Sequence, residues 1–235
     1  MPKSPPSYPS SKRRWPPVSK SETENSRAKE ARAEAVSVSI AALKRGEVIV
    51  FPTETLYGLG ADALDAAAVE KVFQLKDRDA DSPIPVLVAD REMLSRLVAE
   101  VPPLAETLIA CFWPGPLTIV LPARSAIPRP LVNAKGGVGV RLSSQSIAAE
   151  LIEALGHPLT ATSANPSGKA PARTLKEAKK YFAGRLDIFI DGGELTSRTG
   201  STVVEIIGES LRIIRVGDIS KPELEAALGL GRILP

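Results

Sequence analysis

The chain has 235 residues, of which 43% are hydrophobic and 24% are charged, and its formal net charge is +3. This composition is typical of a globular protein and excludes a wholly disordered chain, and no uncharged apolar run is long enough for a membrane span. One cysteine, Cys111, and one histidine, His157, exclude an internal disulfide and a metal site built from several Cys or His ligands. A serine hydrolase would depend on His157 alone, and no nucleophile-elbow motif lies near it.

The basic charge is concentrated at the N-terminus. Residues 1–35 hold eight basic and four acidic side chains, whereas residues 36–235 hold 22 basic and 23 acidic side chains. The first twenty residues contain six prolines, five serines and no acidic residue. We therefore expect a disordered tail over residues 1–25 and a single domain over residues 26–235. A solvated tail is the main interpretation, and an RNA-contacting arm and a targeting segment are the alternatives.

Helical and strand patterns alternate along the domain. Helices are predicted over 27–45 with Gly46 as the stop, over 66–76 after the cap Asp65, after the cap Asp90, over 102–112, over 145–155 with Gly156 as the stop, and after the capping boxes Thr174–Glu177 and Ser220–Glu223. Strands are predicted over 48–51, 84–88, 117–121, 138–141, 158–162, 187–190, 202–207 and 211–215. This alternation predicts a three-layer α/β domain with a mixed sheet.

Polar residues follow the first predicted strand, where ligands of alternating α/β folds usually lie. Residues 52–60 combine two threonine hydroxyls, a carboxylate, a phenol and two glycines. Glycine lets the backbone turn tightly and approach a ligand closely. The spacing is equally consistent with a binding loop and with a plain polar turn that places Tyr57 in the core.

Two cations lie at the end of the helix predicted over 66–76. In an extended segment, Lys76 and Arg78 point to the same face, because side chains alternate with period two. Such a pair suits a polyphosphate, which can lie between the lysine point charge and the arginine fork. The alternative is a solvated surface loop whose aspartates neutralise both cations.

Uncharged hydrogen-bonding groups follow the strand predicted over 158–162. Ser163 and Asn165 offer a hydroxyl and an amide that suit a sugar, a phosphate or an adenine edge, although both are also ordinary turn residues. Ser201 and Arg215 adjoin the last two strands and would add a hydroxyl and a guanidinium at the same mouth. The sequence holds neither a Walker A motif nor a Gly-x-Gly-x-x-Gly fingerprint in the right context.

Taken together, these motifs resemble those of the YrdC/Sua5 (TsaC) family of threonylcarbamoyl-AMP synthases. The matching segments occur in that family's order: Pro-Thr-Glu-Thr-Leu-Tyr-Gly-Leu at 52–59, Lys-x-Arg at 76–78, Trp-Pro-Gly-Pro-Leu-Thr at 113–118, Val-Gly-Val-Arg at 138–141, Thr-Ser-Ala-Asn-x-Ser-Gly at 162–168, Ser-Thr-Val-Val at 201–204 and Arg-x-Gly at 215–217. The separated Lys-x-Arg and Ser-x-Asn pairs are the family's signature. One departure is Leu87, at a position where some relatives carry a histidine.

The resemblance implies a twisted open mixed sheet flanked by helices, with a large concave cavity. It also implies a nucleotidyltransferase, an L-threonylcarbamoyladenylate synthase, that converts L-threonine, bicarbonate and ATP into threonylcarbamoyl-AMP and pyrophosphate. The product supplies t6A at position 37 of tRNA, and t6A transferase partner proteins carry out the transfer. Mg²⁺ would be carried mainly by the nucleotide phosphates. We expect a cytoplasmic protein without membrane contact.

The resemblance also assigns roles to individual residues. Lys76 and Arg78 are expected to be catalytic, through phosphate and carboxylate contacts. The threonine site is expected to comprise Thr53, Tyr57 and Arg141. The ATP site is expected to comprise Lys76, Arg78, Thr118, Ser163, Asn165, Ser201 and Arg215.

Two alternatives stay open. A paralogue of the same fold would bind double-stranded RNA or a nucleotide without making the adenylate, although the nearly neutral domain argues against strong binding of double-stranded RNA or tRNA. A carbamoyl-transfer module like the one inside hydrogenase-maturation proteins would be accompanied by zinc-finger and acylphosphatase segments, which this sequence lacks.

Overall fold

The computed structural model describes residues 26–77, 83–229 and 231–234. The described helices are α1 (Ser26–Lys44), α2 (Ala66–Lys76), α3 (Arg91–Leu97), α4 (Pro103–Phe112), α5 (Ser146–Leu155), α6 (Leu175–Phe182) and α7 (Lys221–Leu228), with one 3₁₀ turn, η1 (Arg129–Leu131). The strands are β1 (Ile49–Pro52), β2 (Tyr57–Gly60), β3 (Val86–Leu87), β4 (Leu117–Pro122), β5 (Gly137–Arg141), β6 (Leu159–Thr160), β7 (Thr162–Ser163), β8 (Thr202–Ile207) and β9 (Ser210–Arg215). The tail expected over residues 1–25 lies outside the described residues.

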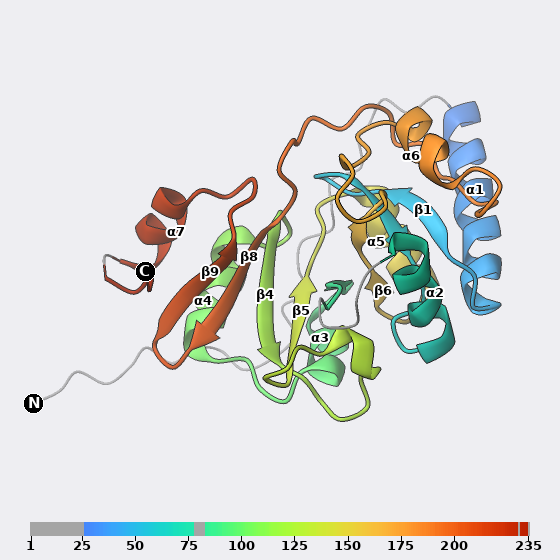
Figure 1. Cartoon of the computed structure of the whole chain (residues 1–235). Helices are drawn as coiled ribbons and strands as arrows, with labels where there is room; N and C mark the ends of the chain where they lie inside the picture. The colour runs from blue at the N-terminus through green and yellow to red at the C-terminus, as the bar shows by residue number, and fades with distance from the viewer. Residues whose placement is uncertain (1–25, 78–82, 230, 235) are drawn as a thin grey trace, which may run out of the picture.

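The strands form two sheets (Figure 1). The larger sheet has the order β6-β3-β5-β4-β8-β9, in which β3 pairs with β5 and β4 with β8 in parallel while the other neighbours are antiparallel. The smaller sheet is antiparallel, with the order β1-β2-β7. The predicted α/β class with a mixed sheet flanked by helices is therefore confirmed.

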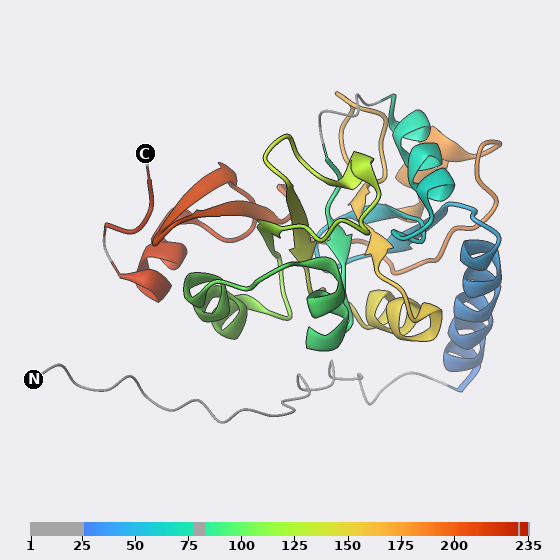
Figure 2. The same ribbon diagram turned by 90° about the horizontal axis from the view of Figure 1, so that it is seen from below.

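The two faces of the larger sheet differ in character. Figure 2 shows α3, α4 and α5 side by side along one face. Side chains alternate between the faces of a strand, and in β4 the fully buried Leu117 and Ile119 alternate with Thr118 and Val120, which line a cavity. One face of the sheet thus builds the core with the helices, and the other builds the candidate site.

The predicted helix caps are confirmed by their hydrogen bonds. The Asp65 carboxylate accepts from the backbone at the start of α2, and the Asp90 carboxylate does so at the start of α3. Full capping boxes, in which side chain and backbone satisfy each other, open α6 at Thr174 and α7 at Ser220. Within the described part of the chain, no helix is both long and apolar enough to cross a bilayer.

The strand predicted over 158–162 is wrong in one respect, because it is divided between the two sheets. Leu159 and Thr160 pair with β3, whereas Thr162 and Ser163 pair with β2. At the crossing point, the backbone N–H of Ala161 donates to the carbonyl of Pro85 at 2.9 Å. The two sheets therefore meet at Ala161, beside the cavity.

The segment after β1 also differs from expectation, because its second half is a strand rather than a loop. Tyr57–Gly60 pairs with β1 in a hairpin and with β7 on its other edge. Glycine is required there by close approach: a Cβ on Gly60 would lie 2.8 Å from Cε1 of Phe51. The glycines thus accommodate the buried Phe51 ring.

Two other predicted strands are shorter in the structure. The strand over 84–88 is reduced to Val86–Leu87, because Pro85 lacks the N–H that a strand interior needs. The strand over 187–190 is reduced to a single parallel bridge between Phe189 and Val50.

Candidate functional site

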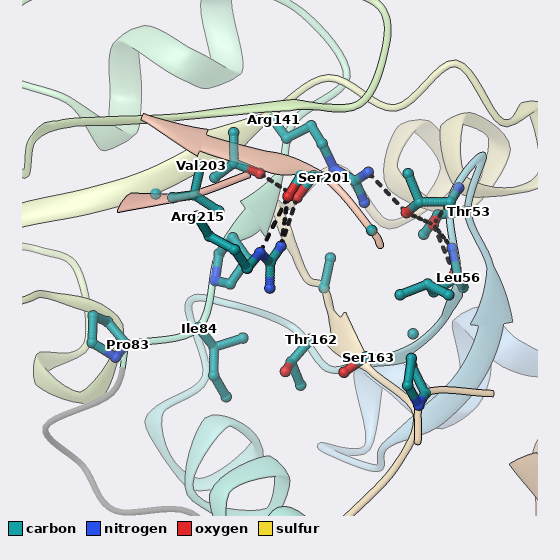
Figure 3. Close-up of a pocket in the computed structure, with 18 of the residues that line it drawn as sticks. Thr53, Leu56, Pro83, Ile84, Arg141, Thr162, Ser163, Ser201, Val203 and Arg215 are labelled. Carbon is teal, nitrogen blue, oxygen red and sulfur yellow. Dashed lines mark hydrogen bonds between the residues drawn. The ribbon is translucent and has the colours of Figure 1, made fainter. Parts of the chain in front are cut away.

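A cavity of about 620 Å³ is lined by segments of both sheets, a volume in the range of small-molecule binding sites. Its walls bring together residues from seven separated parts of the sequence (Figure 3). Eight residues predicted from the sequence lie in its lining: Thr53, Tyr57, Thr118, Arg141, Ser163, Asn165, Ser201 and Arg215. Lys76 is not in this lining, and Arg78 lies outside the described residues.

One wall is a hydroxyl and guanidinium cluster where β4, β8 and β9 meet. The hydroxyls of Thr118 and Ser201 are 2.9 Å apart. Arg215 Nη2 donates to the Ser201 carbonyl at 2.8 Å and to its hydroxyl at 3.2 Å. Arg215 is exposed at the cavity rim, whereas the two hydroxyls are buried. This wall offers hydrogen bonds and a positive charge to an anionic ligand.

The opposite wall begins with the turn between β1 and β2. The Thr53 hydroxyl donates to the Leu56 carbonyl at 2.7 Å and accepts from the backbone N–H groups of Thr55 and Leu56 at 3.2 Å. Thr53 therefore acts first as the residue that closes this turn. The turn holds the side chains of Thr55 and Leu56 in the cavity lining.

Tyr57 lines the cavity, but its phenol oxygen is bound to another segment. The hydroxyl donates to the Gly193 carbonyl at 2.8 Å and accepts from the Gly192 N–H at 2.9 Å. Burial raises the pKa of Tyr57 to about 12. The phenol therefore stays neutral at physiological pH and ties β2 to the segment that leads toward β8.

Arg141, the last residue of β5, is almost fully buried and forms an ion pair that the sequence analysis did not predict. Its Nη1 donates to Glu54 Oε1 at 2.7 Å and to the Thr55 hydroxyl at 3.3 Å. The other carboxylate oxygen of Glu54 accepts a hydrogen bond from the Ser143 hydroxyl. Glu54 and Ser143 are functional candidates that the sequence did not lead us to predict. Glu54 could have been inferred, because a buried arginine needs a carboxylate partner.

Lys76 binds the loop that follows β7, on the side away from the cavity lining. Lys76 is 2% exposed, and its Nζ donates to the carbonyls of Ser163 at 2.6 Å and Asn165 at 2.8 Å. Direct contact of Lys76 with a phosphate stays a prediction, and Lys76 does not line the cavity. Instead, its positive charge lies directly behind the loop that lines the cavity.

Asn165 has its donors committed within the loop. Its Nδ2 donates to the carbonyls of Pro166 at 2.9 Å and Lys169 at 2.8 Å. Its Oδ1 is buried and has no hydrogen-bond partner among the described residues. Asn165 therefore offers an acceptor, which suits a hydroxyl or an N–H of a ligand better than a phosphate oxygen.

The mouth of the cavity contains further polar groups. Lys169 and Thr199 line it and are exposed, the first after β7 and the second before β8. In the described ranges, no group of three or more His, Cys, Asp or Glu side chains is placed to hold a metal ion. The site as a whole combines neutral hydrogen-bonding groups with cations, which suits a phosphate-bearing or carboxylate-bearing ligand.

Comparison with known proteins places these features in one family. The sequence model of Sua5_yciO_yrdC, described as "Telomere recombination", matches residues 41–217. Threonylcarbamoyl-AMP synthase of Pyrococcus abyssi is 40% identical over 206 residues, covering 87% of this chain and 61% of the relative. The Thiobacillus denitrificans protein of the same name is 39% identical over 172 residues, covering 72% of this chain and 90% of the relative.

Solved structures agree with these sequence matches. P. abyssi Sua5 complexed with L-threonine superposes with a TM-score of 0.81 at 38% identity, over 85% of this chain and 59% of that one. Escherichia coli YciO superposes with a TM-score of 0.73 at 27% identity, over 81% of this chain and 93% of that one. The chain thus spans about three fifths of the length of the P. abyssi protein.

Proposed function

Because the chain belongs to the Sua5/YciO/YrdC family, we propose that it is an L-threonylcarbamoyladenylate synthase, a nucleotidyltransferase that uses L-threonine, bicarbonate and ATP. The observation that carries this proposal is the convergence of eight predicted residues on one cavity of about 620 Å³. A second support is the name of the Pyrococcus relative and of its complex with L-threonine.

The proposed reaction needs positioning and charge stabilisation more than a covalent nucleophile. The threonine amine combines with bicarbonate to give a carbamate and water. A carbamate oxygen then forms a bond to the α-phosphorus of ATP, while the bond from that phosphorus to the bridging oxygen of the β-phosphate breaks and pyrophosphate leaves. Negative charge grows on the phosphoryl oxygens, and fixed cations and hydrogen-bond donors stabilise it.

Each wall of the cavity receives a role in this proposal. Thr118, Ser201 and Arg215 hold the phosphates, and the Ser163–Asn165 loop holds the nucleoside part. Lys76 acts from behind that loop by its charge, and Arg78 completes the expected pair of catalytic cations.

Threonine occupies the opposite wall in the proposal. The turn at Thr53 and the ring of Tyr57 shape its pocket, and Arg141 binds its carboxylate. Leu87 leaves no histidine at the position where some relatives carry one, so these groups supply the recognition.

Mg²⁺ enters the proposal with the nucleotide. The donors on the described cavity walls include hydroxyl and cationic groups, which fit phosphate oxygens better than a metal ion. The ion would therefore be held chiefly by the triphosphate, where it neutralises charge on the leaving pyrophosphate. We further propose a cytoplasmic location, where t6A transferase partner proteins use the product.

Labelled bicarbonate tests the proposed function directly. With ATP present, radiolabel is expected to enter an AMP-linked product, with equimolar release of pyrophosphate, only when L-threonine is supplied. Equal incorporation with any amino acid would defeat the assignment. A protein that binds nucleotide or double-stranded RNA but releases no pyrophosphate would support the paralogue alternative instead.

A further inference from the structure

The Glu54–Arg141 ion pair joins the two sheets at the cavity wall, which Arg141 lines. Glu54 lies in the turn after β1, in the smaller sheet, and Arg141 ends β5, in the larger sheet. Their side chains are 14% and 5% exposed, which makes this the most buried ion pair among the described residues. Burial of two charges is costly unless they are paired and hydrogen-bonded. Loss of either partner would therefore leave an uncompensated buried charge.

The arrangement divides the guanidinium of Arg141 into two sides. Its Nη1 is occupied by Glu54 and Thr55. Its Nε and Nη2 make no hydrogen bond with the described residues, although Arg141 lines the cavity. A guanidinium binds a carboxylate best through two adjacent N–H groups in a fork. The edge formed by Nε and Nη2 is therefore available for such a ligand.

Glu54 is itself fixed at both oxygens. One oxygen accepts from Arg141 and the other from the hydroxyl of Ser143, two residues further along the same extended segment. The turn that carries Glu54 is closed by the Thr53 hydroxyl. The carboxylate therefore has little conformational freedom, and the guanidinium bound to it is restricted in the same way.

We propose that Glu54 is a positioning residue that fixes Arg141 so that its Nε–Nη2 edge binds the carboxylate of the amino-acid substrate. This inference rests on the proposed function, since it concerns the threonine pocket. Glu54 does not line the cavity and acts through Arg141 without touching the substrate. Its hydrogen bonds, rather than its charge, carry the effect.

Two variants of Glu54 distinguish an effect of its hydrogen bonds from an effect of its charge on carboxylate binding. Glu54→Gln removes the charge but keeps an oxygen to accept from Arg141 and gains an amide to donate to the Ser143 hydroxyl. Glu54→Ala removes both the charge and the hydrogen bonds. If Glu54 only neutralised Arg141, both variants would bind a carboxylate more tightly, because a nearby negative charge would be gone.

The experiment measures binding of L-threonine and of L-threoninol, which lacks the carboxylate, to the full chain by calorimetry. Glu54→Ala is expected to weaken threonine binding by about tenfold or more, as for loss of a charge-assisted hydrogen bond, and to leave threoninol and nucleotide binding unchanged. Glu54→Gln is expected to restore most of the threonine affinity. Glu47→Ala, which breaks the exposed Arg45–Glu47 pair, is the matched control and is expected to bind like the unmodified chain.

Three results would overturn the inference. One is a Glu54→Ala protein that keeps the same preference for threonine over threoninol, and another is a rise in threonine affinity in both Glu54 variants. An unmodified chain that binds neither compound would overturn the proposed function and this inference together. If Glu54→Ala does not fold, Ser143→Ala replaces it, with an expected loss of about threefold in threonine affinity alone; an unchanged affinity there would count against the inference.

Discussion

Lys76 places a positive charge where lysine is rarely found, since the residue is 2% exposed and its Nζ donates to two backbone carbonyls. Lys76→Ala removes both hydrogen bonds and the charge behind the cavity wall. We expect adenylate formation to fall by about tenfold or more, because a charge-assisted contact contributes about 1.5–3 kcal/mol. Pyrophosphate release at saturating threonine measures this effect.

The same helix provides a control for this prediction. Lys71 also donates from Nζ to a backbone carbonyl, that of Gly46 at 2.7 Å, but it does not line the cavity. Lys71→Ala is therefore expected to keep the rate of adenylate formation. An unaltered rate in Lys76→Ala would remove Lys76 from the catalytic site.

Individual residue types were predictable where chemistry alone suggested a ligand. Hydroxyl, amide and guanidinium groups next to predicted strands pointed to Ser163, Asn165, Ser201 and Arg215, and all of them line the cavity. Thr118 was indicated only by the family resemblance, and it lines the cavity as well. The orientation of a side chain was not predictable, because it depends on partners far away in the sequence. Lys76 turns to carbonyls 87 and 89 residues away, and Arg141 turns to a carboxylate 87 residues away.

At the scale of elements, caps were predictable and strand boundaries were not. A capping box is a local pattern of four residues, and both predicted boxes are formed. The strand over 158–162 looked continuous because the sequence Pro-Leu-Thr-Ala-Thr gives no sign of where one sheet ends. Its division at Ala161 is set by pairing with β3 on one side and β2 on the other.

Tyr57 links β2 to the segment that leads toward β8, and this link predicts a pH effect on stability. Burial raises the pKa of Tyr57 to about 12, above the ordinary value of about 10. The neutral phenol therefore stabilises the fold fully below about pH 10, and this contribution is lost as the pH rises from about 10 to 12. Tyr57→Phe lacks the phenol, so it should be less stable at pH 8 by about 1–3 kcal/mol, because Gly192 and Gly193 lose their partner.

Urea unfolding at pH 8, 10 and 11.5, values chosen as about two units below, at and above the ordinary tyrosine pKa, tests this link. The stability difference between the unmodified chain and Tyr57→Phe should narrow as the pH rises. Tyr181→Phe is the control, because the phenol of Tyr181 makes no hydrogen bond with the described residues. A difference that stays constant with pH would contradict a titrating phenol at Tyr57.

At the scale of the whole molecule, the cavity is lined by segments of both sheets, which are joined at several points. The described joints include the crossing at Ala161, the Glu54–Arg141 pair and the hydrogen bond from the Thr160 N–H to the Ala61 carbonyl. The fold class followed from the alternation of helices and strands. The cavity did not, because it depends on how the smaller sheet sits against the larger one, which no local pattern encodes.

Removal of the N-terminal segment is expected to change the net charge of the chain without changing its catalytic rate. Residues 1–25 hold five of the 30 Lys and Arg residues and two of the 27 Asp and Glu residues, so their removal leaves equal numbers of basic and acidic groups. Because their composition does not favour a packed core, the shortened chain should keep its thermal midpoint and its rate of adenylate formation. Any weak, salt-dependent binding of double-stranded RNA should decrease, since such binding scales with the phosphates neutralised by Lys and Arg. Thermal unfolding, pyrophosphate release and RNA titration at two salt concentrations check the three expectations, and a large drop in the midpoint would show that the segment packs against the domain.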